Sequence, residues 1–385
     1  MNLTNEENNT KIIDHSVKCS PNDKNEYYYD VLPNGLRYIL ISNKDIDKSA
    51  VALDVYIGSA DDPKEYQGLA HCLEHMIFLG TKKYPNTSEF DDFLSLNSGN
   101  SNANTSLDHT NFHFEICHEK LEKGIDMFSE FFTEPLFKQE LLDKELNAID
   151  SEFKLDFRDD SNRLVYLFLF EGYENSHFNT FINGNLETLK KNEIRDKVIE
   201  FYNNKYDASI MSLCVFSNKE IKELNDLVIK YFSKIKRNIN YTKTPKNILY
   251  DNNNMGYLYK IIPIKDNSYL HFMWIINKSY NSYYKSEPYN YVVSVLGHES
   301  RHSLTSYFKK KGYIYELVSS YNETYEMFTR IKIVIKLTDE GYKNYEEIIK
   351  IVLSYINYLQ KEELHKDFFE ELKISSEINF FRRTK

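Results

Sequence analysis

Residues 68–85 read GLAHCLEHMIFLGTKKYP, and this stretch places two histidines and a glutamate close together. Residues 63–79 follow two aspartates and contain Gly68 as their one internal helix breaker, so the sequence predicts a helix over 63–79. His71 and His75 are one helical turn apart, and both imidazoles can therefore reach a single metal ion, with Glu74 beside them. The alternative is a surface helix that carries two histidines by chance.

A metal held by these histidines needs a further ligand from another part of the chain. A catalytic zinc uses three protein ligands and keeps a fourth position open, and H-x-x-E-H is the inverted form of the zinc-peptidase motif. The predicted helix over 138–158 contains neither Gly nor Pro and carries Glu145 and Glu152 two turns apart on one face. Either glutamate could be the third ligand, and a solvated helix face is the alternative.

Strands and helices surround this motif without regular βαβ alternation. A hairpin is expected around Leu32-Pro33-Asn34-Gly35, between strands at 27–31 and 36–41. Further strands are expected at 50–57, 111–116 and 206–217, and helices at 63–79, 88–96, 118–133, 138–158 and 218–234. This order favours an α+β domain with helices on one face of a mostly antiparallel sheet.

The second half of the chain repeats this order in outline, as a degenerate copy of the first. Strands are expected at 257–262, 270–276, 314–320 and 327–337, and helices at 289–296, 303–310 and from 339 onward. The sequence thus predicts a polar leader over 1–26, a catalytic zinc-binding α+β domain over 27–235, a polar linker over 236–256 and a second, non-catalytic α+β domain over 257–385.

Composition and charge exclude several classes of protein. A hydrophobic fraction of 41% with 28% charged residues is ordinary for a soluble globular protein. The formal net charge of −10, with Lys and Arg spread along the chain, argues against nucleic acid as a partner. No apolar run approaches the roughly 18 to 20 residues that a membrane span needs, so no membrane partner is expected. The 4 widely spaced cysteines indicate a reducing, cytoplasmic location without a disulfide framework.

Residues 68–85 resemble the active-site helix of the insulysin branch of the pitrilysin family of zinc metallopeptidases. The likeness continues in the same order over residues 27–385. It includes Ser101–Ser106, His109–Phe112, Glu145, Asn147–Glu152, Asn183–Asn185 and Leu296–Glu299. The resemblance implies an α+β chain built from two homologous domains.

The resemblance also implies a role for each residue of the predicted zinc site. His71, His75 and Glu152 would be the Zn²⁺ ligands. Glu74 would be the general base that activates the metal-bound water, and Glu145 would orient a ligand. Such a carboxylate beside the metal can take a proton from water and return it to the leaving amine.

Two further regions match the places where the family holds its peptide substrate. Asn102 and Ala103 match an edge strand, so their backbone groups are expected to pair with an extended peptide. The second region is the place where the family has an exosite for the N-terminus of the substrate. The residues of this chain at that place are His298, Leu317, Val318, Ser319 and Ser320. This chain departs from the family pattern at Asn104, which replaces an aromatic residue, at Ser300-Arg301-His302 and at Ser319-Ser320, which replace glycines.

Full-length relatives in this family have four such domains in two halves, and the present sequence matches the first two. The C-terminal half contributes an arginine and a tyrosine that help to bind and polarise the substrate. The resemblance therefore implies a zinc-dependent endopeptidase that hydrolyses short peptides in an enclosed chamber. Its C-terminal half would lie in the same chain or in a separate subunit, and the isolated 385-residue chain is expected to be weakly active or inactive. The rival class is a non-catalytic structural or peptide-binding subunit that needs a partner half.

Overall fold

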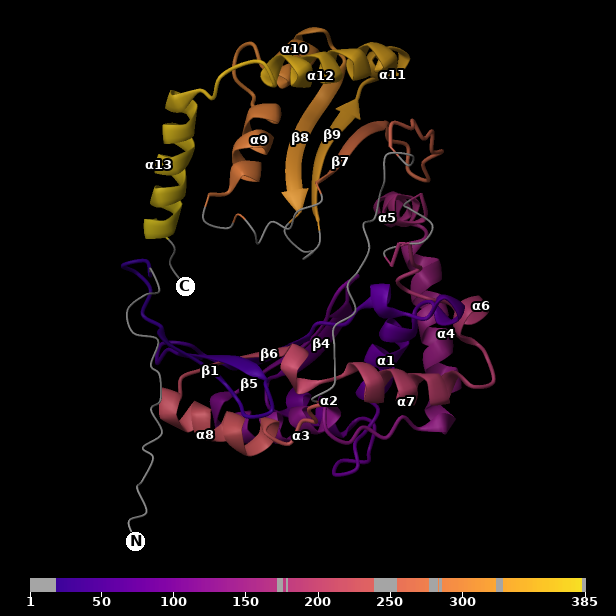
Figure 1. Ribbon diagram of the computed structural model, residues 1–385, viewed down its shortest axis with the longest axis vertical. Coiled ribbons are helices and arrows are strands. Elements are labelled where there is room, and N and C mark those ends of the chain that lie inside the picture. The colour runs from indigo at the N-terminus through magenta and orange to yellow at the C-terminus, as the bar shows by residue number, and fades with distance from the viewer. Residues whose placement is uncertain are drawn as a thin grey trace. The chain divides into compact units, whose positions relative to one another are not determined.

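The computed structural model describes residues 19–171, 176–177, 179–238, 255–276, 283, 286–322 and 328–382 (Figure 1). They form two compact units. The first comprises the described residues of Met1–Asp156 and His177–Pro245, and the second those of Phe157–Ser176 and Lys246–Arg382. Most of the predicted linker lies outside the described residues, as do residues 1–18 of the predicted leader.

The first unit is built on a six-stranded sheet in the order β1-β2-β6-β3-β5-β4. Its strands are β1 (Glu26–Val31), β2 (Arg37–Ser42), β3 (Ser49–Val55), β4 (Asn100–Thr105), β5 (Thr110–Ile116) and β6 (Met211–Ser217). Only β2 and β6 pair in parallel, so the sheet is mostly antiparallel, as predicted. Strand β4 is at one edge, which leaves one side of its backbone without a strand partner.

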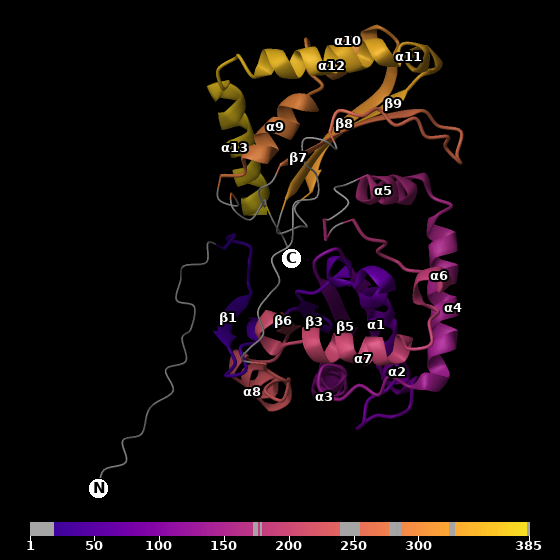
Figure 2. The same ribbon diagram turned by 45° about the vertical axis from the view of Figure 1, so that its right-hand side comes forward.

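Helices α2, α3 and α8 cover one face of this sheet (Figures 1 and 2). The helices of the unit are α1 (Leu69–Ile77), α2 (Glu89–Leu96), α3 (Leu121–Phe131), α4 (Gln139–Asp156), α6 (Leu186–Leu189), α7 (Ile194–Lys205) and α8 (Ile221–Phe232). The strands alternate apolar and polar residues, so Val51, Leu53 and Val55 of β3 are buried in a single core with Phe128 and Val228 from the helices. The helical layer on one face confirms the predicted arrangement.

Two boundaries in the first unit differ from the prediction. Helix α1 begins at Leu69 and not at residue 63, because Gly68 has a left-handed backbone (φ 88°) that starts a new helix there. Residues before it form the separate 3-10 turn Lys64–Tyr66. Strand β6 begins at Met211 and not at residue 206, because Ala208–Ile210 form a 3-10 turn that the Asp207 side chain caps. Helix α7 was not predicted.

The second unit repeats the central part of the first on a smaller scale. Its sheet has the order β7-β9-β8, with β7 (Tyr269–Ile276), β8 (Ile314–Asn322) and β9 (Thr329–Leu337) all antiparallel. Its helices are α5 (Asp160–Phe170), α9 (Pro288–Leu296), α10 (Leu304–Lys310), α11 (Asp339–Lys343), α12 (Tyr345–Leu359) and α13 (Lys366–Arg382). The order β7-α9-α10-β8-β9-α12 matches β3-α1-α2-β4-β5-α3, which confirms two related α+β domains.

Two predictions for the second unit were wrong. Residues 257–262 form no strand, since they are irregular and Ile262 is 85% exposed. The helix expected from residue 339 is divided into α11, α12 and α13. At the first division, the Asn344 side chain donates to the Glu340 carbonyl and ends α11. Helix α5, inside the predicted first domain, belongs to the second unit.

Contacts within the second unit explain the position of α5. The Asp160 carboxylate at its start accepts hydrogen bonds from the backbone N–H groups of Ile264 and Lys265. At its other end the Phe168 ring packs 6.4 Å from the Phe328 ring.

Among the described helices none combines the length and the apolar character that a membrane crossing requires.

Candidate active site

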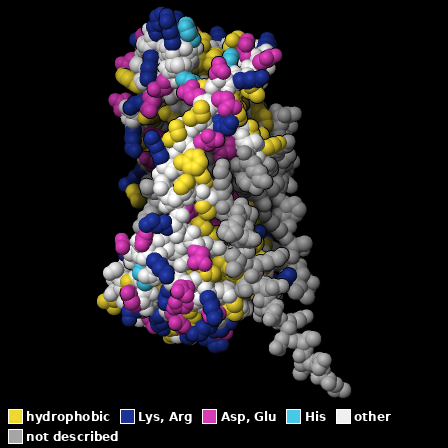
Figure 3. Space-filling view, turned by 90° about the vertical axis from the view of Figure 1, so that its left-hand side faces the viewer, with side chains coloured by type: hydrophobic (Ala, Val, Ile, Leu, Met, Phe, Trp, Pro, Cys, Tyr) yellow, Lys and Arg dark blue, Asp and Glu magenta, His cyan; other side chains and the backbone are white. Residues whose placement is uncertain are grey.

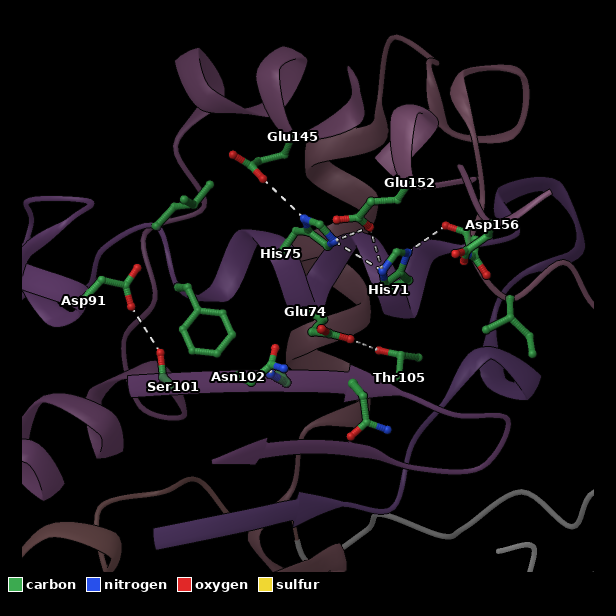
Figure 4. Close-up of a pocket in the computed structure, with 16 residues that line it drawn as sticks. His71, Glu74, His75, Asp91, Ser101, Asn102, Thr105, Glu145, Glu152 and Asp156 are labelled. Carbon is green, nitrogen blue, oxygen red and sulfur yellow. Dashed lines mark hydrogen bonds and ion pairs between the residues drawn. The ribbon is translucent and has the colours of Figure 1, made fainter. Parts of the chain in front are cut away.

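Helix α1 directs three polar side chains into one pocket of about 610 Å³ (Figure 4). His71, Glu74 and His75 line this pocket, together with Glu145 and Glu152 from α4. The opposite side of α1 is apolar and buried, and the helix packs against α4, α7 and β4. The 3.6-residue period therefore separates the packing face from the polar face and brings the three motif residues to one side.

The start of α1 is held by a buried carboxylate and a close backbone approach. Asp62 accepts hydrogen bonds from the N–H groups of Gly68 (2.7 Å) and Ala70 (2.8 Å), which lack partners within the helix. Burial raises the pKa of Asp62 well above its ordinary value, against the lowering effect of these two hydrogen bonds. A Cβ atom on Gly68 would lie 2.3 Å from the Gly184 Cα, so the loop at 183–185 can contact α1 only if residue 68 is glycine.

That loop orients the first histidine. His71 Nδ1 lies 2.8 Å from the Asn183 carbonyl oxygen, which can only accept. The hydrogen on this ring is therefore assigned to Nδ1, and the lone pair of Nε2 faces the pocket. The Asn183 side chain in turn donates to the Asp156 carboxylate at 2.9 Å.

A carboxylate orients the second histidine in the same way. His75 Nδ1 lies 3.3 Å from the Glu145 Oε2, so Nδ1 donates and Nε2 again presents a lone pair. Burial disfavours the protonated ring, but the hydrogen bond to Glu145 and the charges of Glu152 and Glu74 outweigh it and raise the pKa of His75. Glu145 thus contacts the edge of the His75 ring that faces away from the centre of the pocket.

The two Nε2 atoms and Glu152 form a set of donor atoms suited to a metal ion. His71 Nε2 and His75 Nε2 are 3.2 Å apart, and the Glu152 Oε2 is 3.7 Å from the first and 3.4 Å from the second. Tetrahedral ligands at about 2.0 to 2.2 Å from zinc are separated by about 3.3 to 3.6 Å. Two lone pairs that face each other at this distance repel unless a cation lies between them, so the residues fit a zinc ion.

Glu74 lies between the three candidate metal-ligand atoms and the edge strand β4. Its side chain is 8% exposed, and its Oε2 accepts a hydrogen bond from the Thr105 hydroxyl at 2.6 Å. Figure 4 shows Glu74 pointing toward β4 and the Thr105 side chain. The Thr105 hydrogen bond holds the carboxylate at the pocket, where a base would be needed.

The register of β4 shows which backbone groups face its open edge. Ser106 N–H donates to the His109 carbonyl, and hydrogen-bonded pairs alternate along an antiparallel ladder. Asn102 therefore exchanges its backbone hydrogen bonds with His113 in β5, whereas the N–H and C=O groups of Ala103 face outward. This differs from the expectation that the backbone groups of both residues are open to a peptide. The Asn102 Oδ1 instead accepts a hydrogen bond from the Ala103 N–H at 2.9 Å.

The predicted exosite residues lie in the second unit. The His298 ring packs 5.1 Å from the Phe368 ring, and its Nδ1 accepts a hydrogen bond from the Ser300 N–H. The Leu317 side chain is 4% exposed and belongs to the core, whereas Val318 is 46% exposed. A buried side chain cannot touch a peptide, so Leu317 can offer only backbone groups.

Sequence reasoning gave no role at the site to three residues that position it. Asp62 was expected only as one of two acidic caps before the predicted helix, and nothing in the pattern distinguished Thr105 within its polar stretch. Asn183 acts through its backbone carbonyl, which any residue type supplies. Its neighbour Gly184, at φ +67°, was the one available signal of a tight contact.

Comparisons with known proteins identify the family of the chain. Residues 37–164 match the family described as Insulinase (Peptidase family M16), and residues 193–375 match the Peptidase M16 inactive domain. The chain is 38% identical to the insulin-degrading enzyme of Homo sapiens over 96% of its length, 36% identical to an insulin-degrading enzyme homolog of Dictyostelium discoideum over 94%, and 32% identical to the A-factor-processing enzyme of Saccharomyces cerevisiae over 93%. It spans 37%, 37% and 35% of these relatives.

Solved structures show the same fold. The crystal structure of pitrilysin superposes with a TM-score of 0.90 at 26% identity, over 97% of this chain and 40% of that one. A protease from Helicobacter pylori superposes with a TM-score of 0.74 at 18% identity, over 92% of this chain and 85% of that one. The fold is that of a pitrilysin-like protein. The chain belongs to the insulinase family, peptidase family M16.

Proposed function

We propose that this chain carries the catalytic site of a zinc-dependent endopeptidase, with His71, His75 and Glu152 as the metal ligands. The observation that carries the proposal is the pair of Nε2 atoms 3.2 Å apart, each with its Nδ1 already engaged. Zinc bound there would act as a Lewis acid that lowers the pKa of a water molecule and polarises a peptide carbonyl. The intact set argues against the alternative of a non-catalytic subunit.

The side chains around the metal ligands have separate tasks. Glu74 accepts a proton from the attacking water and donates it to the leaving amine, as the general base and acid. Thr105 holds the Glu74 carboxylate toward the pocket. Glu145 keeps the His75 hydrogen on Nδ1, and the Asn183 carbonyl does the same for His71, so both rings offer Nε2 to the metal.

The substrate is a peptide bound as an added strand along β4. The outward N–H and C=O groups of Ala103 pair with the peptide backbone, and the Asn102 side chain moves off the Ala103 N–H when the peptide binds. Backbone pairing reads no side chains, so selection of sequence depends on other surfaces. His298 and Val318 in the second unit are candidates for such a surface.

The complete enzyme encloses short peptides in a chamber that needs a further half, in the same chain or in a partner subunit. The proposal rests on the relatives, of which this chain spans 37%. The four cysteines are free thiols, which fits the proposed cytoplasmic location.

Metal content and peptide cleavage test the roles of these residues separately. Glu74→Gln is expected to retain one zinc per chain and to lose cleavage of a quenched peptide in the complete enzyme. Glu152→Ala is expected to lose the metal, and Glu140→Ala, an exposed change on the same helix, is expected to lose neither. Elemental analysis that shows zinc lost from Glu74→Gln but retained by Glu152→Ala would overturn the role assignment.

The isolated chain provides a second test. We expect it to bind zinc and to cleave the quenched peptide slowly or not at all, because half of the chamber is missing. Rapid turnover by the monomeric chain would contradict the need for a further half.

A further inference from the structure

The open face of the second-unit sheet carries a row of basic side chains. Residues of β9 alternate between the two faces, and Ile331, Ile333 and Ile335 are buried against the helices. The opposite face therefore receives Arg330, Lys332, Val334 and Lys336, and we call its three cations the basic row. Helices α9, α10 and α12 pack on the apolar face. The opposite face is contacted at its Arg330 end by the Phe168 ring of α5, and Lys332 and Lys336 lie further along the strand.

Among the described cross-strand neighbours of the basic row, one side chain is a carboxylate. Cross-strand neighbours on this face are Ile275 and Asn322 beside Arg330, Met273 and Ser320 beside Lys332, and Tyr269 and Glu316 beside Lys336. Glu316 is the one acidic side chain among them and lies at one end. No ion pair is formed by Arg330, Lys332 or Lys336 within the described part of the chain. Their charges are thus not neutralised by the sheet.

The charges on this face repel one another. Burial and the charge of Arg330 lower the pKa of Lys332, and burial and the charge of Lys332 lower the pKa of His271 on β7. The Arg330 guanidinium lies 5.0 Å over the Phe168 ring, and its Nε is buried with no hydrogen-bond partner among the described residues. Among the described residues, the cations of the basic row therefore have no ion-pair partner.

The basic row contrasts with the rest of the molecule. The formal net charge is −10, and on the face drawn in Figure 3 Lys and Arg side chains are interspersed with Asp and Glu side chains. An acidic ligand is repelled by the molecule as a whole, so a local positive face selects where it binds.

We propose that the basic row binds an acidic peptide in an extended conformation, with carboxylates at alternate positions. Arg330 and Lys332 are two residues apart on a strand, which spaces their Cα atoms by about 6.8 Å. Alternate side chains of an extended peptide have the same spacing and point to one side. The choice of a peptide as the ligand rests on the proposed peptidase function. The basic row adds to that function a preference for Glu-x-Glu or Asp-x-Asp segments.

Binding of two isomeric peptides to the full chain tests this arrangement. One labelled peptide alternates four Glu with four Ser, and the other has the four Glu in a block. Fluorescence anisotropy in EDTA should show tighter binding of the alternating peptide, weakened by added salt. Lys332→Gln combined with Lys336→Gln should weaken this binding about fivefold. Lys310→Gln combined with Lys350→Gln makes the same charge change on α10 and α12 and should not.

Several results would overturn the proposal. They are equal weakening by the two double variants, equal binding of the two Glu peptides, and equal binding of a Lys-Ser peptide by the unmodified chain. A single-stranded oligonucleotide serves as a further competitor. If the unmodified chain binds it as tightly as the alternating Glu peptide, and Lys332→Gln combined with Lys336→Gln abolishes that binding, the face is assigned to nucleic acid and the proposal is overturned. EDTA removes zinc from every measurement, so failure here is distinct from failure of the zinc site.

Discussion

Two glutamates on α4 differ in what they touch, although both lie on one helix face. Glu152 approaches the Nε2 atoms of both histidines, whereas Glu145 contacts only the His75 Nδ1. A carboxylate that donates electron density directly to a metal contributes more to affinity than one that acts through a ring. The residue scale therefore distinguishes two roles that helical spacing leaves equivalent.

Zinc affinity should separate these two glutamates. Glu145→Gln is expected to weaken zinc binding about tenfold, because the amide still accepts from Nδ1 but carries no charge. Glu152→Ala removes a ligand and should weaken binding more than about a hundredfold. Competition with a chromophoric chelator measures both, with Glu140→Gln as the control. Equal losses for Glu145→Gln and Glu152→Ala would show that Glu145 coordinates the metal.

At the scale of elements, β4 provides a test of strand addition that keeps the sheet intact. Proline removes one N–H, which the ladder tolerates only where that N–H faces away from the neighbouring strand. Ala103→Pro should thus leave stability within about 1 kcal/mol and raise the KM for peptides in the complete enzyme. Asn102→Pro loses a bond to β5 and should cost about 3 kcal/mol. Thermal melts that rank the two variants the other way would contradict the register argument.

The contact between α1 and the loop at 183–185 provides a second test at this scale. Gly68→Ala strains a backbone at φ +88° and drives a Cβ to 2.3 Å from the Gly184 Cα. Gly312→Ala strains a similar backbone at φ +72° but meets nothing within 4 Å. Gly312→Ala, the control, should lower the free energy of unfolding by about 1 kcal/mol, and Gly68→Ala should lower it by about 3 kcal/mol or more.

Gly68→Ala should also weaken zinc binding, because the loop that it displaces carries the carbonyl that orients His71. Denaturant unfolding and chelator competition measure the two effects. Full zinc affinity in a destabilised Gly68→Ala protein would show that the loop does not orient the histidine.

At the scale of the whole molecule, every proposed zinc ligand lies in the first unit. Zinc at a hundred times its dissociation constant stabilises the unit that binds it by about 2.7 kcal/mol. Calorimetry should show that EDTA lowers the unfolding temperature of the first unit and leaves that of the second unchanged. Glu152→Ala should abolish the shift. Equal shifts of both transitions would contradict a metal site confined to one unit.

Prediction from sequence succeeded where a short-range pattern carries the information. The alternation in 111–116 and the turn at Leu32–Gly35 produced β5 and the β1–β2 hairpin, as expected. It failed where a distant contact decides, as when Asp62 and Gly184 determine the start of α1. Residues 257–262 contain apolar side chains and yet form no strand, because an apolar run becomes a strand only when a neighbouring strand pairs with it.

The sequence by itself determined the pair of histidines, the two candidate glutamates and the repeated α+β order, because helical spacing and strand alternation are properties of neighbours in the chain. Only the tertiary structure decided which glutamate meets both histidines, which ring nitrogen of each histidine faces the pocket, and that Ala103 and not Asn102 turns its backbone to the open edge. These choices depend on α4, the loop at 183–185 and β5, which are separated from the residues they orient by 112 positions in the case of Asn183 and His71. No local pattern encodes such contacts, because packing in three dimensions creates them.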